Sequence, residues 1–205
     1  MRRWRLAFLC ALTLVASSPL ARGDEATDLL FFSGDLMARR DYAGIGWLHA
    51  ASGLDLNGPV LSTELGRQQD GSAYGQALAG WRFVAYGVWA TAMGGVEIKP
   101  EYAPALRPLA SADLWFEPAP AWMAAAQFQA TPDYVSWRFA VGLKPMENWP
   151  WIGPEAGASA GEPRVGLHAT GLRLAGGFEA RASVGVSWQC GQSGPYGELS
   201  IWRRF

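Results

Sequence analysis

The sequence predicts an all-β fold, namely an antiparallel up-and-down transmembrane β-barrel of about 12 strands. Three observations support this fold class. The chain begins with the pattern of a secretory leader, short segments of alternating apolar and polar residues fill the rest, and the last residue is an aromatic one, Phe205. An exported chain of this kind is typical of the barrels in Gram-negative outer membranes.

Residues 1–23 are expected to form a signal peptide. Three arginines give a basic start, residues 6–16 are apolar, and Ala21 and Gly23 place small residues at the cleavage positions. The apolar stretch is shorter than the roughly 20 residues of a membrane-spanning helix, and no later stretch is longer. We expect cleavage after Gly23 and a single outer-membrane barrel domain over residues 24–205.

The composition favours a surface that faces lipid. Only 17% of the residues are charged, and lysine occurs only at Lys99 and Lys144, whereas soluble surfaces carry roughly 25–35% charge. The chain has 11 tryptophans, and indoles favour membrane interfaces. Loss of the leader removes four arginines and no acid, so the net charge falls from −1 to −5. This negative net charge argues against a nucleic-acid partner.

Period-two alternation defines the elements. Between Phe178 and Gln189 the even positions are apolar and the odd positions polar or small, and residues 135–144 repeat the pattern. A strand sorts these residues onto two faces, whereas a helix would scatter them. The same rule gives strands near 29–37, 43–51, 59–68, 74–82, 84–97, 107–117, 121–131, 134–144, 151–159, 164–174, 177–189 and 195–205.

Turn-forming residues separate most of these strands. They lie at 53–58, 70–71, 118–120, 132–133, 161–163, 176–177 and 191–195. The boundary between 74–82 and 84–97 is the weakest, because residues 81–83 include no turn former. With both ends in the periplasm, the longest connection, 99–108, would lie outside and the short 118–120 turn inside.

Alternation does not say which face points outward. A soluble barrel or sandwich shows the same pattern with the apolar face inside. The scarcity of lysine, the many tryptophans and the Gly-rich and Ala-rich second face favour apolar side chains that meet lipid.

Polar residues on the second face are candidates for the barrel lumen. They are Asp113, Arg138, His168, Glu179 and Arg181. A carboxylate pair could hydrolyse a glycoside, but we favour a salt-bridged plug, which small barrels commonly contain. His49 and His168 are the only histidines, and neither has a carboxylate or cysteine at ligand spacing. We therefore expect no metal, no cofactor and no catalytic residue.

Five segments, taken in order and spacing, carry a family resemblance: 31–36 (FFSGDL), 46–50 (GWLHA), 153–155 (GPE), 168–173 (HATGLR) and 193–197 (SGPYG). Together they resemble the alphaproteobacterial cellulose biosynthesis protein BcsS family. The resemblance implies a non-enzymatic accessory factor in the outer membrane. Its partners would be the cellulose synthase and secretion machinery, cellulose itself and outer-membrane lipid.

A glucan partner gives a second interpretation to three tryptophans near strand ends. The indoles of Trp47, Trp149 and Trp151 could stack on the flat CH face of a glucose ring. An interfacial girdle explains the same residues without a ligand, and we prefer it.

The sequence thus predicts a barrel that scaffolds or anchors exported glucan. Two alternatives stay open. One is a small outer-membrane hydrolase or acyltransferase that acts on lipid or glycan. The other is a soluble periplasmic β-sandwich that binds glucan.

Overall fold

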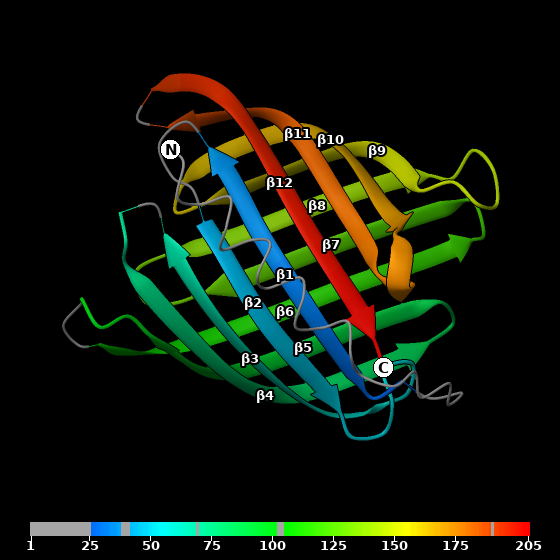
Figure 1. Ribbon diagram of the computed structural model, residues 1–205, viewed down its shortest axis with the longest axis horizontal. Coiled ribbons are helices and arrows are strands. Elements are labelled where there is room, and N and C mark those ends of the chain that lie inside the picture. Colours follow the sequence, from blue (N-terminus) through cyan, green and yellow to red (C-terminus); the bar gives the residue numbers. More distant parts are fainter. Residues whose placement is uncertain (1–25, 38–41, 69, 102–104, 190) are drawn as a thin grey trace.

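Twelve strands make up the computed structural model, which describes residues 26–37, 42–68, 70–101, 105–189 and 191–205 (Figure 1). The expected signal peptide lies outside the described residues. The strands are β1 (Asp28–Met37), β2 (Tyr42–Ala50), β3 (Gly58–Gln68), β4 (Ala73–Ala85), β5 (Val88–Ile98), β6 (Leu106–Ala119), β7 (Trp122–Ala130), β8 (Val135–Leu143), β9 (Trp151–Ser159), β10 (Glu162–Arg173), β11 (Glu179–Gln189) and β12 (Gln192–Arg204).

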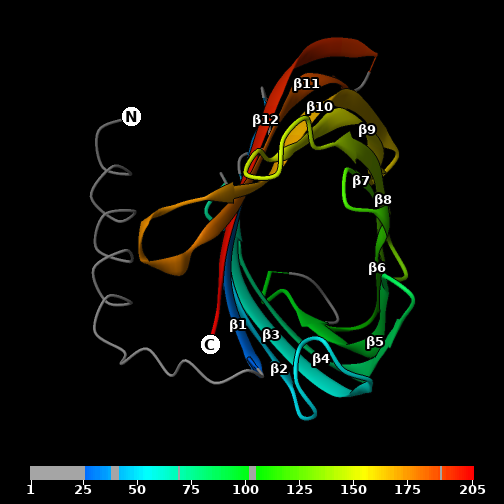
Figure 2. The ribbon, with the colours of Figure 1, turned by 90° about the vertical axis from the view of Figure 1, so that its right-hand side faces the viewer.

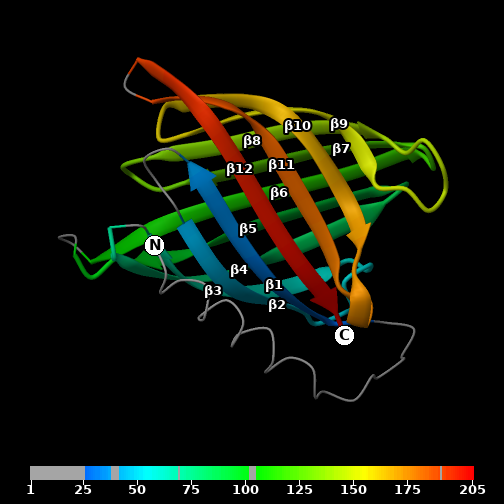
Figure 3. The same cartoon turned by 45° about the horizontal axis from the view of Figure 1, so that its top comes forward.

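The strands form one closed antiparallel barrel in which each strand pairs with its neighbours in the chain. The seam is closed by β1 and β12, with Phe32 opposite Ile201, and the two strands run side by side in Figures 1 and 3. Figure 2 looks toward one end of the barrel, and the strands form a ring. The amide of Phe205 donates to the carbonyl of Asp28 at 3.0 Å. Both described ends of the chain therefore lie at one end of the barrel, here called the terminal end.

The apolar face of the strands points outward, as the composition predicted. On β11, Val184 is 64% exposed, whereas its neighbour Ser183 is 2% exposed and faces the lumen. The same outward exposure recurs around the barrel, at Leu61, Leu65, Phe83, Phe139, Val165 and Leu167. A hydrophobic exterior around a polar interior is the arrangement of a transmembrane barrel, and it excludes the soluble sandwich.

The β4–β5 turn lies where the sequence analysis did not place it. The expected strand 84–97 was wrong at its start, because the turn falls at Tyr86 and Gly87, with φ of 51° and 73°. Two consecutive residues with positive φ make the tight hairpin turn that matches strand twist. Tyrosine is not a usual turn former, so the sequence analysis did not place the turn at this position.

Three further boundaries differ because tight turns need fewer residues than the breakers suggested. β10 begins at Glu162 after a turn at Ala160 and Gly161, and β12 begins at Gln192. β6 extends to Ala119 through an irregular register after Phe116. The expected contrast of long outer and short inner connections was also wrong, because 51–57 and 144–150 at the terminal end are as long as 99–105 at the other end.

Inward glycines let the strands curve tightly around a narrow interior. A Cβ on Gly95 would lie 2.0 Å from the carbonyl oxygen of Ala77 on β4, so only glycine fits there. At the terminal end, Leu54 from the 51–57 connection packs with Leu48, Ala50 and Val60 in an apolar cluster. In the described residues, no helix is long and apolar enough to cross a membrane.

Candidate functional site

Polar side chains gather in the lumen of the barrel. One row follows successive cross-strand partners from β4 to β8, at Arg82, Thr91, Asp113, Gln127 and Arg138. Arg82 Nε donates to Thr91 Oγ1 at 3.0 Å, and Arg138 Nη2 donates to Gln127 Oε1. Alternation placed Asp113 and Arg138 on this inner face, and the structure brings them into one continuous row.

Ion pairs connect strands that are not neighbours in the barrel wall. Arg138 on β8 pairs with Glu198 on β12, although three strands separate them along the wall. Arg164 on β10 lies 3.0 Å from Glu198 and 3.6 Å from Asp35 on β1. We call these four residues the central cluster. Because its members reach past intervening strands, the central cluster ties non-adjacent strands of the wall together.

A second polar group lies beside the central cluster. Glu155 on β9 accepts hydrogen bonds from Arg181 Nη2, from Ser183 Oγ at 3.0 Å and from Tyr196 Oη at 2.7 Å. Glu155 and Arg181 are both buried. Arg181 was expected in the lumen, and the structure places it there with a carboxylate partner that the sequence analysis had not named.

His168 also faces the lumen, where it is only 2% exposed. Its Nδ1 lies 2.9 Å from Thr170 Oγ1 and its Nε2 lies 3.1 Å from the carbonyl oxygen of Val141. Both ring nitrogens are engaged, so the side chain has the geometry of a structural histidine. Among the described residues, no group of three or more His, Cys, Asp or Glu side chains could hold a metal ion.

Glu179 lies apart from the other lumen candidates. It is exposed at the first position of β11, at the terminal end, and accepts a hydrogen bond from Trp202 Nε1 at 3.2 Å. The structure therefore does not bring Glu179 to the central cluster. The reason is its position at the end of the strand, where the inward face opens to solvent.

At the opposite end, the buried carboxylate of Glu97 has two partners. Tyr134 Oη donates to Glu97 Oε1 at 3.1 Å, and Lys99 Nζ lies 3.2 Å from Glu97 Oε2. Burial, followed by the Glu97 carboxylate, raises the pKa of Tyr134 well above its usual value. Tyr134 therefore stays a neutral hydrogen-bond donor.

The three tryptophan candidates all lie toward the terminal end but point in three directions. Trp47 is on the outer face, where its Nε1 donates to Asp28 Oδ1 at 2.9 Å and its ring stacks with His49. Trp149 is exposed in the 144–150 connection. Trp151 faces the lumen, as the alternation of β9 requires. The three side chains do not form one surface.

Trp151 instead meets a fourth tryptophan. Its ring lies edge-to-face with Trp115 of β6, with centroids 5.5 Å apart, and Lys144 Nζ lies 3.4 Å from the centroid of Trp151. Trp115 Nε1 donates to Glu117 Oε1 at 2.7 Å. The period-two pattern of β6 could have revealed Trp115, since it falls two positions after Asp113 on the inner face.

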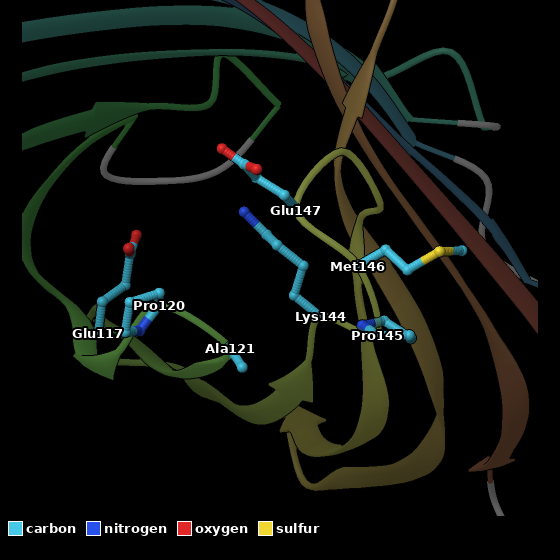
Figure 4. A pocket seen from close by; sticks show the side chains of 7 residues that line it. All are labelled: Glu117, Pro120, Ala121, Lys144, Pro145, Met146 and Glu147. Atoms are coloured by element: carbon cyan, nitrogen blue, oxygen red, sulfur yellow. The ribbon is translucent and has the colours of Figure 1, made fainter.

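A cavity of about 420 Å³ opens beside these rings and is called the mouth cavity. It lies between the β6–β7 turn and the 144–150 connection, and Lys144, Glu117 and Glu147 direct their side chains into it (Figure 4). The amide of Lys144 donates to the carbonyl of Ala121 at 2.8 Å, which joins its two walls. The cavity therefore combines acceptors, a cation and nearby aromatic rings.

The sequence comparisons bear on the half of the chain that carries most of these groups. No curated protein sequence matches the chain. Residues 109–205 match the model of a family described as cellulose biosynthesis protein BcsS. This match covers slightly less than half of the chain and supports the BcsS family. The matched residues include the mouth cavity, the Glu155 group and all of the central cluster except Asp35.

Two solved structures resemble this barrel. One is the KdgM porin, with a TM-score of 0.62, and the other is the KdgM porin in complex with disordered oligogalacturonate, with a TM-score of 0.60. Each shares 9% sequence identity, and the match covers 86% of this chain and 99% of the porin chain. At this identity the similarity shows a common fold, the porin-like barrel.

Proposed function

We propose that this chain is a non-enzymatic outer-membrane barrel that scaffolds or anchors exported glucan during cellulose biosynthesis. The observation that carries the proposal is the set of ion pairs across the lumen of a BcsS-family barrel. Residues 1–23 would direct export and be removed, and residues 24–205 would form the inserted barrel. The outward apolar side chains suit a location in the outer membrane.

The lumen favours anchoring over conduction of a polymer. The pairs of Arg138 with Glu198 and of Arg164 with Asp35 join separated strands, and Gln129 Nε2 donates to Gln76 Oε1 at 3.1 Å between β7 and β4. Side chains that meet across a barrel of about this strand number leave little room for a continuous glucan chain.

The charge balance of the lumen favours a neutral saccharide. Arg138, Arg164 and Arg181 each pair with a carboxylate of the same wall. An oligogalacturonate is an acidic chain, and its recognition calls for cationic groups that are available to it. In this chain the arginines of the central cluster are already neutralised, so the lumen offers hydrogen bonds without a net attraction for anions.

Deletion of the gene tests the cellular role. Cellulose is measured on the cell surface and in the medium, and the wild-type gene is restored as a control. We expect less surface cellulose and a larger share in the medium. Unchanged amounts and unchanged attachment would reject the role.

The conductance of the purified protein in planar bilayers tests the mechanism. We expect a small conductance in the wild type and a larger one after Arg138→Ala, because the substitution removes a side chain that projects into the lumen and pairs with Glu198. A wild-type conductance as large as that of an open porin would argue for transport instead.

A second candidate function, a membrane-edge hydrolase or acyltransferase, has one structural support. His49 Nδ1 lies 3.1 Å from Asp28 Oδ1 on the outer face, and a carboxylate can orient a histidine that acts as a base. His49→Ala with the fold retained separates the two functions. An enzyme that uses His49 loses activity on lipid or glycan, whereas a scaffold keeps its effect on cellulose attachment.

A further inference from the structure

The mouth cavity is an open recess at the terminal end of the barrel, and its lining includes three charged side chains. Its volume of about 420 Å³ falls within the range of about 300–1,000 Å³ that is usual for small-molecule sites. Its walls come from two connections that the Lys144–Ala121 backbone hydrogen bond holds together. The recess is therefore part of the fold and does not depend on one loose loop.

We propose that the mouth cavity binds a short stretch of a neutral glucan chain at the terminal end of the barrel. The inference rests on the proposed function and names where the polymer docks. The carboxylates of Glu117 and Glu147 would accept hydrogen bonds from sugar hydroxyls, and the ammonium of Lys144 would donate one. Saccharide hydroxyls are both donors and acceptors, so a site with both kinds of partner suits them.

The aromatic pair behind Lys144 completes a saccharide site. Lys144 lines the cavity and also covers the ring of Trp151, whose other neighbour is Trp115. When the Lys144 ammonium moves to a sugar hydroxyl, it uncovers an indole face on which the CH groups of a glucose ring can pack. Trp151 Nε1 is buried without a hydrogen-bond partner in the structure, which leaves a donor close to the site.

The charge of the site selects between neutral and acidic chains. Two carboxylates and one ammonium give the cavity lining a net negative charge, so a uronate chain would be repelled. The terminal end would face the periplasm if the barrel is inserted with both ends of the chain inside. An exported glucan would meet this mouth before it reaches the cell surface.

The experiment is calorimetric titration of the detergent-solubilised barrel with cellopentaose and with pentagalacturonate. Wild type should bind cellopentaose and should not bind pentagalacturonate. Lys144→Ala and Glu147→Ala should each weaken cellopentaose binding at least fivefold, because each removes a charged hydrogen-bonding partner. Heat-modifiable gel mobility verifies that both variants remain folded.

The matched control is Glu101→Ala, which removes an exposed carboxylate at the opposite end of the barrel and should leave affinity unchanged. If wild type binds cellopentaose and the cavity variants bind it equally well, the docking site is wrong while the glucan-anchoring function stands. If wild type binds no cellopentaose, both proposals fail. Tighter binding of pentagalacturonate would overturn the inferred neutral class.

Discussion

Glu155→Gln should destabilise the barrel through Arg181. Glu155 accepts three hydrogen bonds, and its carboxylate is the ion-pair partner of Arg181. The side chains are 1% and 7% exposed respectively, so water cannot replace the lost charge. The glutamine side chain keeps one oxygen that can accept a hydrogen bond from Tyr196 or Ser183. Its NH2 group, however, is a donor and cannot accept the hydrogen bond of the Arg181 guanidinium.

The expected loss is about 3–5 kcal/mol in the free energy of unfolding, which is the usual cost of removing one partner of a buried ion pair. Urea unfolding of the barrel in lipid vesicles measures it, and for a slope of about 2 kcal/mol per molar the midpoint should fall by about 1.5–2.5 M. Arg181→Met in the Glu155→Gln background removes the stranded charge and should recover most of the loss.

Asp133→Asn is the control, because Asp133 pairs with Arg107 but is 57% exposed. Exposed pairs contribute at most about 1 kcal/mol. The reasoning is refuted if Glu155→Gln costs no more than this control, or if the double variant remains as unstable as the single one. Either result would mean that lumen water solvates Arg181.

Three further predictions concern the barrel wall. Gly95→Ala should lower the free energy of unfolding in urea by about 1–3 kcal/mol, because the added Cβ would meet the Ala77 carbonyl. The control is Gly94→Ala, whose added Cβ would have nothing within 4 Å, and it should change the free energy by no more than about 0.5 kcal/mol. Equal effects of the two substitutions would disprove the close approach at Gly95. Val184→Arg should cost about 2–4 kcal/mol in vesicles if this outward position lies near the membrane midplane, and a neutral result would place it in water. Tyr86→Asn should stabilise the barrel by about 0.5–1 kcal/mol, because asparagine tolerates the positive φ at this turn; a lower unfolding midpoint would contradict this.

Much of the site could be predicted from the alternation of residues along the strands. The site residues that the sequence analysis did not name follow the same period-two pattern. Glu198 and Arg164 lie on the inner face by period two, as Arg138 and His168 do. What alternation could not supply was the partner of each charge. Arg138 and Glu198 are 60 residues apart, and their contact depends on how far the lumen separates β8 from β12.

The sequence by itself determined the strand count, the two-faced strands and the apolar exterior, because side chains alternate strictly along a strand and lysine-poor apolar faces suit lipid. The tertiary structure alone decided which charges pair, that Trp151 packs against Trp115, and that Lys144, Glu117 and Glu147 border one cavity. The physical reason is that the closure, curvature and strand stagger of the barrel bring together residues from distant strands. None of these three properties can be inferred from a local repeat in the sequence.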